Sequence, residues 1–299
     1  MLIKKNPENV LPIEPTARAL ARAPRNIGAI LVEEGKLSPA DAEQVVEQQR
    51  RLGLRFGEAA LQLNLITDSD LRRALATQFD FSYLQAGPED ISRELVAAYE
   101  PFHPRVEELR SVRTQLLIRW YNPDAGRRIL AVVSPGPREG RSYVTANLGI
   151  VFAQLGLRVL IVDADMRSPR QHSLFNIPDR VGLSAALSGR SDHRSAVAIP
   201  GMENLAVLPA GTIPPNPQEL LSRATFATLL KEAQAEFDLV LVDTPPAALY
   251  ADVHTIAFRT GDALLLARKD STRVADTVRV SRELADTGTR IVGTVMNAF

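Results

Sequence analysis

The chain has 299 residues, of which 45% are hydrophobic, and it carries 35 basic and 35 acidic side chains. This length predicts about two domains, the balanced charge gives no reason to expect a nucleic-acid partner, and the absence of cysteine excludes a disulfide framework. No apolar run approaches the roughly 20 residues that span a bilayer and no signal peptide opens the chain, so a cytoplasmic protein is expected.

Residues 1–25 are rich in Pro, Arg and Ala, which predicts a flexible tail. A repeat follows, in which residues 26–49 match residues 55–78. Gly28 matches Gly57, and apolar positions match throughout the two copies. Each copy has the hydrophobic pattern of two helices, so residues 26–84 are predicted to form a small all-α repeat domain.

Capping boxes mark the start of the second helix in each copy. Ser38 precedes Asp41 by three positions, and Thr67 precedes Asp70 in the same way. At this spacing the hydroxyl and the carboxylate can each accept a hydrogen bond from a backbone N–H at the helix start. The simplest interpretation of this pattern is a small helical docking domain.

The repeat resembles the N-terminal domain of type II secretion ATPases of the MshEN type, some of which bind cyclic di-GMP. In that domain each motif opens with an arginine that contacts guanine. Arg55 keeps this arginine, whereas Asn26 stands in the first copy, and Asn64 replaces the glycine matched by Gly35. The resemblance implies a helical fold and leaves two functions open, protein docking and cyclic di-GMP binding at Arg55.

Residues 85–100 are predicted to be a linker, punctuated by Gly87-Pro88, and residues 101–299 a second domain. Near the start of this domain, three charged residues at helical spacing share one face of a predicted helix: Glu107, Arg110 and Arg113. Without further information, such a face is typical of a solvated surface.

The next stretch has the order of a phosphate-binding P-loop. Ile129–Val133 is an apolar, β-branched run typical of a buried parallel strand, and a Pro/Gly-rich loop at residues 134–140 follows it. Then come Arg141, Ser142 and a helical pattern over residues 143–155. In a P-loop the backbone N–H groups face the phosphates and the hydroxyl reaches Mg²⁺.

Two positions depart from the strict P-loop pattern. Pro135 stands where the first glycine is expected, and Arg141 stands where a lysine is expected. Arginine is a planar fork and lysine a compact point charge, so this exchange is not conservative in a tight loop. The loop therefore supports nucleotide binding better than fast catalysis, and a strand–turn–helix connection without a ligand is the alternative.

Two further apolar strands end in carboxylates. Residues 159–167 contain Asp163 and Asp165, spaced to lie on one face of an extended chain, and residues 237–246 contain a strand that ends in Asp243. The carboxyl ends of parallel strands line the crevice in which α/β sheets bind ligands, and Mg²⁺ prefers oxygen ligands. These carboxylates favour a nucleotide site over a simple turn.

Residues 100–299 resemble the bacterial tyrosine kinases (BY-kinases) of capsule and exopolysaccharide synthesis, which belong to the ParA/MinD-like P-loop group. The resemblance lies in three motifs: Ser134, Pro137, Gly140 and Ser142 in the first, Asp163 and Asp165 in the second, and Asp243 in the third. Residues 107–113 and 208–221 also resemble this family, and the loop with arginine is most similar to the EpsG-type chain-length-determinant kinases. The implied fold is α/β with a mainly parallel sheet.

The resemblance also implies a role for each motif. Arg141 is expected at the β/γ phosphates of ATP, and Asp163 is the expected base near the attacking hydroxyl, with Asp165 as the third catalytic residue. Mg²⁺ is expected on Ser142, Asp165 and Asp243. The residues expected to bind ATP are Pro137, Arg138, Glu139, Gly140, Arg141, Ser142, Tyr143 and Asn297. Asn297 would read adenine, although an asparagine in a turn has the same pattern.

Two family features concern assembly and the phosphate acceptor. In BY-kinases the ExxRxxR motif packs one subunit against the next in a ring, so Glu107, Arg110 and Arg113 imply a homo-oligomer. These kinases usually autophosphorylate a tyrosine cluster after the last strand, whereas this sequence ends at Phe299 without tyrosines nearby. Weak autophosphorylation at the C-terminus is therefore expected.

The sequence thus predicts an ATP- and Mg²⁺-dependent protein-tyrosine kinase that controls exopolysaccharide chain length with a membrane chain-length-determinant partner. ATP hydrolysis without protein phosphorylation is the simpler activity of the same site. The alternatives are a ParA/MinD-type positioning ATPase and a non-catalytic regulator that responds to a nucleotide or to cyclic di-GMP. Residues 107–113 and 208–221 argue against the positioning ATPase.

Overall fold

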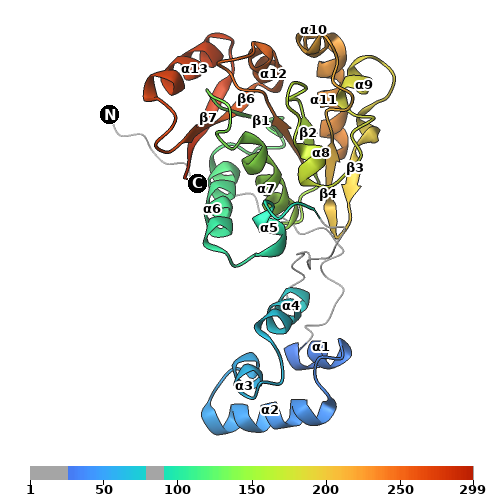
Figure 1. Ribbon diagram of the computed structural model, residues 1–299, viewed down its shortest axis with the longest axis vertical. Helices are drawn as coiled ribbons and strands as arrows, with labels where there is room; N and C mark the ends of the chain where they lie inside the picture. Colours follow the sequence, from blue (N-terminus) through green and yellow to red (C-terminus); the bar gives the residue numbers. More distant parts are fainter. Residues whose placement is uncertain (1–25, 79–90, 299) are drawn as a thin grey trace. The chain divides into compact units, whose positions relative to one another are not determined.

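The computed structural model describes residues 26–78 and 91–298, and the chain divides into two compact units, residues 1–82 and 83–299. The predicted tail at residues 1–25 lies outside the described residues. Each unit has its own hydrophobic core. Figure 1 labels the helices and strands of both units. Among the described residues, no helix combines the length and apolar character that crossing a bilayer requires.

The described part of the first unit, here called the repeat unit, consists of two helix pairs, one from each repeat copy: α1 (Ile27–Glu33), α2 (Pro39–Leu52), α3 (Phe56–Gln62) and α4 (Asp68–Gln78). Both predicted capping boxes are confirmed. The Asp41 N–H donates to Ser38 Oγ over 3.1 Å, and the Asp70 N–H donates to Thr67 Oγ1 over 3.2 Å. The returning bond from Thr67 to the Asp70 carboxylate lowers the pKa of Asp70 to about 2.

The matching glycines of the two copies are explained by close helix packing. A Cβ atom on Gly28 would lie 2.9 Å from the Phe56 ring, and one on Gly57 would lie 2.4 Å from Leu71 Cδ1. Larger residues would push the helices apart. The core that this packing closes contains Ile30, Leu31, Leu37, Val45, Ala59, Ala60, Ile66 and Ala74.

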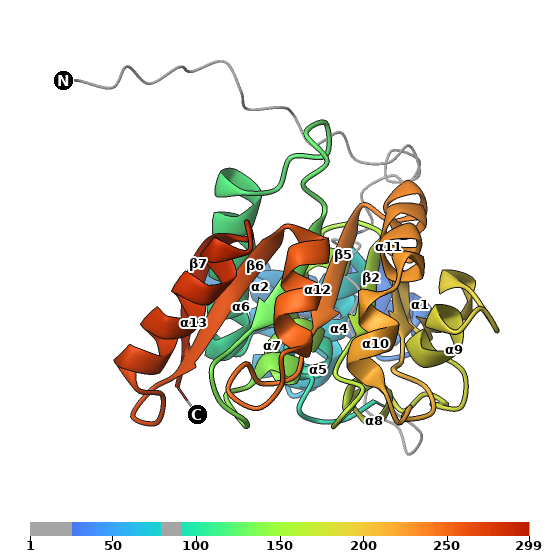
Figure 2. The ribbon, with the colours of Figure 1, turned by 90° about the horizontal axis from the view of Figure 1, so that it is seen from above.

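The second unit, here called the α/β unit, is built on a seven-stranded sheet with the order β3-β4-β2-β5-β1-β6-β7. Figure 2 labels β2, β5, β6 and β7 of this sheet. Every neighbouring pair is parallel except β3 and β4. The predicted α/β fold with a mainly parallel sheet is confirmed. The strands are β1 (Ile129–Val133), β2 (Val159–Asp163), β3 (Val197–Ile199), β4 (Met202–Leu208), β5 (Leu239–Asp243), β6 (Asp262–Arg268) and β7 (Arg290–Asn297).

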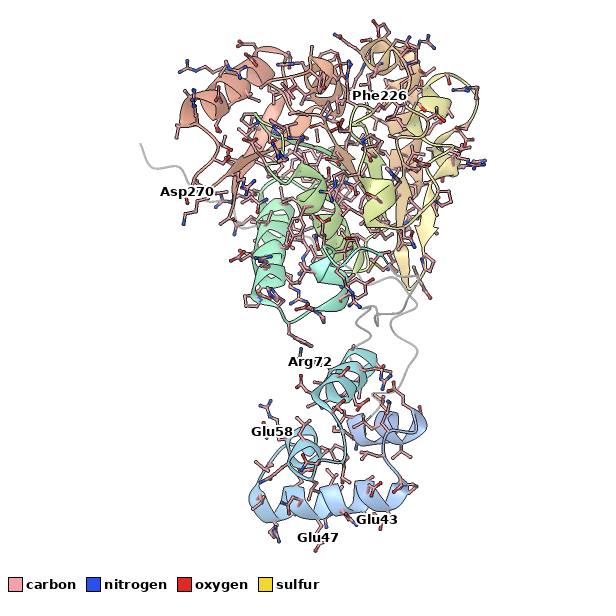
Figure 3. The ribbon with its side chains drawn as sticks, viewed as in Figure 1. Glu43, Glu47, Glu58, Arg72, Phe226 and Asp270 are labelled. Atoms are coloured by element: carbon pink, nitrogen blue, oxygen red, sulfur yellow. The ribbon has the colours of Figure 1, made fainter. Side chains whose placement is uncertain are left out.

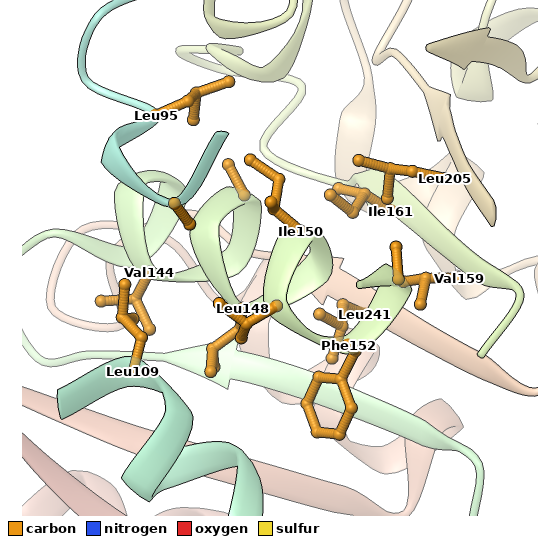
Figure 4. Close-up of a cluster of buried hydrophobic side chains, with 14 of the residues drawn as sticks. Leu95, Leu109, Val144, Leu148, Ile150, Phe152, Val159, Ile161, Leu205 and Leu241 are labelled. Carbon is orange, nitrogen blue, oxygen red and sulfur yellow. The ribbon is translucent and has the colours of Figure 1, made fainter. Parts of the chain in front are cut away.

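Helices cover both faces of this sheet. One face packs against α5 (Val96–Tyr99), α6 (Pro104–Arg119), α7 (Arg141–Ala153) and α8 (Gln171–Leu174). The opposite face packs against α9 (Leu183–Leu187), α10 (Pro217–Ser222), α11 (Ala224–Glu236), α12 (Asp252–Thr260) and α13 (Val274–Asp286), and a 3₁₀ turn, η1 (His193–Ser195), precedes β3. Figure 4 shows Leu148, Ile150 and Phe152 of α7 in the first of these cores, together with Val159, Ile161 and Leu241 of the sheet.

The predicted linker at residues 85–100 is too long at its C-terminal end. Ile91, Leu95 and Ala97 are buried in the core that also contains α6 and α7. Asn147 of α7 accepts a hydrogen bond from the Ala97 N–H over 3.0 Å. The apolar residues from 91 onward therefore belong to the α/β unit, while residues 79–90 lie outside the described residues.

Candidate nucleotide-binding site

Three neighbouring strands bring the predicted motifs to one edge of the sheet. In the order β2-β5-β1, Asp163 of β2 pairs with Asp243 of β5, and Asp243 pairs with Val132 of β1. The loop at residues 134–140 follows β1 directly, and α7 begins at Arg141. The first and third motifs and Asp163 therefore meet at the carboxyl ends of the strands, where α/β sheets bind ligands.

The loop is held in shape by its own glutamate. The Glu139 carboxylate accepts a 2.7 Å hydrogen bond from the Gly136 N–H and another from the Thr272 hydroxyl. Glu139 is 5% exposed, whereas Arg138 is exposed and has a positive φ of 57°. Glu139 was predicted as an ATP-binding residue, and its side chain is engaged in bonds inside the protein.

Two residues from the last parallel strands also fasten the loop. Asn297 Nδ2 donates to the Glu139 carbonyl over 3.2 Å, and Arg268 Nη1 donates to the Arg138 carbonyl over 3.3 Å. Asn297 therefore lies beside the phosphate loop rather than far from it. The adenine contact expected of Asn297 stays a prediction.

Arg141 lies inside the loop, with 8% of its surface exposed. Its Nε donates to the Thr244 carbonyl over 2.7 Å, and its Nη1 donates to the Gly136 carbonyl over 2.7 Å and to the Ser134 hydroxyl. Burial lowers the pKa of this guanidinium, while Asp243, Asp165 and Glu139 act in the opposite direction. Arg141 thus joins the start of the P-loop to the segment after β5.

Asp243 is fully buried, and one of its oxygens has no partner. Its Oδ2 accepts from Gln171 Nε2 over 2.8 Å, and its carboxylate also bonds the Ser142 hydroxyl. Its Oδ1 is buried without a hydrogen-bond partner. Burial raises the pKa of Asp243 to about 6 despite these bonds.

Asp163 is equally buried and lies beside Asp243. Its Oδ2 accepts from the Arg170 and Gln171 N–H groups over 3.0 and 2.9 Å. Burial, and then the Asp243 carboxylate, raise the pKa of Asp163 well above its ordinary value. Two adjacent carboxyl groups in a desolvated site favour holding a proton between them.

The position of Asp165 differs from the predicted one. β2 ends at Asp163, so the two aspartates do not share the face of an extended strand. The chain turns instead, and Asp165 Oδ1 accepts from the Arg167 and Ser168 N–H groups over 3.2 and 2.9 Å. This happens because a short side chain at a strand end can cap the turn that follows. Asp165 still lies close enough to raise the pKa of Asp243.

Gln171 is a site residue that the motifs did not reveal. It is fully buried, its Nε2 donates to Asp243 and to the Ser142 carbonyl, and its Oε1 has no partner. It reaches the site because the chain folds back after Asp163 into α8. No spacing rule in the sequence links a glutamine to the third motif.

The donor set suits Mg²⁺ only in part. Among the described residues, no three His, Cys, Asp or Glu side chains form a group that could hold a metal. The Ser142 hydroxyl and the unpartnered Asp243 Oδ1 are hard oxygen donors. A cation that also takes phosphate oxygens and water fits this arrangement, because such a cation needs few protein ligands.

The remaining predicted residues lie elsewhere. On α6, Arg110 contacts Glu107 over 3.2 Å, while Arg113 donates to the Val151 carbonyl over 2.7 Å. Arg113 therefore ties α6 to α7. In the repeat unit, the Arg55 N–H bonds the Glu58 carboxylate at the start of α3.

Known proteins resemble the α/β unit that carries this site. Residues 130–286 match the family model described as cellulose biosynthesis protein BcsQ. The tyrosine-protein kinase YwqD of Bacillus subtilis (strain 168) is 34% identical over 207 residues, which cover 69% of this chain and 86% of YwqD.

Solved structures of a tyrosine kinase and of a cell division ATPase also resemble this unit. The kinase domain of the Escherichia coli tyrosine kinase ETK has a TM-score of 0.66 and 30% identity, over 72% of this chain and 82% of that domain. The cell division ATPase MinD of Pyrococcus furiosus has a TM-score of 0.50 and 26% identity, over 56% of this chain and 71% of MinD. The chain belongs to the family of bacterial tyrosine-protein kinases, whose α/β unit has the P-loop fold.

Proposed function

We propose that this chain transfers the γ-phosphoryl group of ATP to protein tyrosine hydroxyls and acts in the control of exopolysaccharide chain length. Membership of the tyrosine-kinase family supports the reaction class. The observation that carries the proposal here is the edge of the sheet at which Arg141 and two buried aspartates with raised pKa values meet.

Arg141 can hold the loop and bind a phosphate at the same time. Its Nε and Nη1 are engaged by the Thr244 and Gly136 carbonyls, and its Nη2 donates to no described residue. A guanidinium has donors on all three nitrogens, so Nη2 is available to a phosphate oxygen. Because different nitrogens serve the loop and the phosphate, an arginine can take the place of the usual lysine at this position.

Asp163 is the proposed base. In the transfer, the tyrosine oxygen bonds to the γ-phosphorus, the bond from that phosphorus to ADP breaks, and the tyrosine proton passes to Asp163. A carboxyl group with a raised pKa retains such a proton better than an ordinary aspartate. A bound Mg²⁺ would neutralise charge on the phosphate oxygens, and Ser142 and Asp243 would hold it, with Asp165 adding charge from the next turn.

The proposal is tested by incubating the chain with labelled ATP and Mg²⁺ and measuring protein labelling and phosphate release separately. Asp163→Asn should abolish labelling of a tyrosine substrate while ATP still binds. Asp124→Asn, an exposed change elsewhere in the same unit, is the matched control. Calorimetry that detects no ATP binding by the folded wild-type chain would contradict the whole proposal.

We further propose a membrane chain-length-determinant protein as partner and self-association through α6. Glu107 has 74% of its side chain exposed, so it is open to a second subunit, whereas Arg113 is engaged within the unit. Glu107→Ala should therefore weaken self-association more selectively than Arg113→Ala, which also loosens α6. Sedimentation of the two variants with and without ATP separates these effects.

For the repeat unit we propose protein docking rather than dinucleotide binding. This unit contains a cavity of about 850 Å³ between α1, α2 and Phe56. Its charged lining residues are three glutamates and one arginine: Glu33, Glu43, Glu47 and Arg50. Figure 3 shows Glu43 and Glu47 along α2. Carboxylates disfavour the phosphates of cyclic di-GMP, and Arg55 does not line this cavity. Tight binding of cyclic di-GMP that Arg55→Ala abolishes would reverse this choice.

A further inference from the structure

A cavity of about 320 Å³ lies in the α/β unit between α9, α10 and the segment that follows β4. Its size is at the lower end for ligand sites, so it suits a single side chain or a small ligand better than a nucleotide. The nucleotide site described above uses none of its lining residues. Arg190, Arg223 and Asn216 supply polar groups to the lining, and no described acidic residue does.

Beside this cavity, Gly182 and Gly211 let the backbones of two segments come into close contact. A Cβ on Gly182 would lie 2.1 Å from the Pro209 carbonyl oxygen, so only glycine fits there. The first residues of α9 then bond the segment after β4, with the Ser184 N–H donating to the Ala210 carbonyl over 2.9 Å. The wall that carries Ser184 is therefore bonded to the segment that follows β4.

The polar groups of the cavity lack the partners that would neutralise them. Arg190 Nε bonds only the Ser188 hydroxyl, over 3.0 Å, and neither Arg190 nor Arg223 pairs with a carboxylate of the described residues. Ser184 lines the cavity and is 1% exposed, and its buried hydroxyl has no hydrogen-bond partner among the described residues. A buried hydroxyl without a partner is costly, and an acceptor in the cavity would supply one.

One wall of the cavity follows the carboxyl end of β4, because residues 212–216 come after this strand. β4 is the parallel neighbour of β2, and Leu208 pairs with Val162, the residue before Asp163. The segment after β4 therefore leaves the sheet at the edge that carries Asp163. A ligand in this cavity would lie on the same edge as the phosphoryl-transfer site, on the side of β4.

We propose that this cavity binds a phosphotyrosine side chain of a protein. Two unpaired guanidinium groups match a phosphate dianion, because arginine binds phosphate through paired charge-assisted hydrogen bonds. The apolar part of the lining matches an aromatic ring: Ile213 is 59% exposed and lies beside Pro214, Pro215 and Leu220. That the anion is phosphotyrosine rests on the proposed kinase function, whereas the anion site itself does not.

The test uses the full chain and three probes: a peptide that contains phosphotyrosine, the same peptide with tyrosine, and inorganic phosphate. Each is titrated by calorimetry in excess ADP and Mg²⁺, which occupies the P-loop. The phosphopeptide should bind, and Arg190→Gln or Arg223→Gln should each weaken it about 10-fold, the effect of losing one charge-assisted hydrogen bond. Arg194→Gln is the control, because Arg194 is exposed and contacts Glu236 outside the cavity.

Ser184→Ala sharpens the test. Since the Ser184 hydroxyl has no partner in the free protein, the change should leave the melting temperature unaltered and still weaken the phosphopeptide several-fold. Equal affinity for inorganic phosphate and the phosphopeptide would overturn the phosphotyrosine assignment in favour of free phosphate. Unchanged binding in the Arg190→Gln/Arg223→Gln double variant would overturn the site. Neither outcome depends on kinase activity, so failure here is distinguishable from failure of the proposed function.

Discussion

The helix caps of the repeat unit and the nucleotide site of the α/β unit form their hydrogen bonds over different distances along the chain. In the repeat unit, Ser38 bonds Asp41, three positions away. At the nucleotide site, Arg141 bonds a carbonyl 103 positions away, and Asn297 bonds one 158 positions away. A local motif can therefore specify how a helix begins, whereas the shape of the phosphate loop depends on three strand ends arriving together.

This contrast predicts that the nucleotide site is the most sensitive part of the molecule. Asp243→Asn should reduce tyrosine phosphorylation by about 100- to 1,000-fold, because it removes one preorganised charge at the site of transfer. The measurement is the initial rate of labelling at saturating ATP. Asp238→Asn is less suitable as a control because Asp238 bonds Arg158, so Asp124→Asn serves instead. A rate within a few-fold of wild type would show that Asp243 has only a structural role.

The raised pKa of Asp243 predicts how the stability of the protein depends on pH. The folded pKa of Asp243 is about 6 against an ordinary value of 3.8, so the folded protein binds a proton that the unfolded chain has released. The contribution of this proton to the free energy of unfolding is complete below the unfolded pKa of 3.8 and is lost as the pH rises through about 6. Its upper limit is about 3 kcal/mol, from 1.36 kcal/mol per pKa unit.

Urea unfolding of the nucleotide-free chain, measured between about pH 4 and pH 7, tests this expectation when wild type is compared with Asp243→Asn. The free-energy difference between wild type and variant should shift against the wild type as the pH rises. The stabilisation that Asp70 gives to the cap of α4 in the repeat unit depends on pH in the opposite direction. The pKa of Asp70 is lowered to about 2, so its contribution is present above 3.8 and is lost as the pH falls through about 2.

Local patterns predicted much of the molecule. The apolar run at residues 129–133 predicted β1 with the bounds that the structure has, and both capping boxes were predicted by their spacing. Strand ends also predicted that Asp163 and Asp243 would lie together, because carboxyl ends of parallel strands share one edge. These features depend on hydrophobic period and on contacts within a few residues.

What the sequence did not reveal depends on long-range packing. Gln171 reaches Asp243 only because the chain turns back after β2, and Thr272 reaches Glu139 from the loop that follows β6. Residues 91–100 were assigned to the linker because Gly87-Pro88 indicated a break, yet their apolar side chains fill the core beneath α7. No motif encodes such contacts, since each needs the finished sheet to bring its partners together.

Arg141→Lys separates the two tasks assigned to Arg141. A lysine ammonium can bond either the loop carbonyls or a phosphate, but it cannot span both as a planar guanidinium does. We expect ATP affinity to fall about 10-fold, with a smaller loss of thermal stability. Arg119→Lys, on the exposed end of α6, is the control. Affinity equal to or above that of wild type would show that the loop needs only a positive charge at this position.

The smallest effect is expected at the helix cap of the repeat unit, where the hydrogen bonds are local. Ser38→Ala removes the side-chain acceptor at the start of α2 and should cost about 1 kcal/mol, as for other N-cap changes. The loss should appear as faster amide hydrogen exchange in the first turn of α2, with the kinase rate unchanged, because the cap bonds only Asp41. Ser69→Ala is the matched control, since Ser69 is exposed in the first turn of α4 and alanine is the better helix former. If Ser38→Ala altered exchange around the P-loop as strongly as in α2, the two units would be coupled, and the division between local and long-range bonding drawn from their hydrogen bonds would fail.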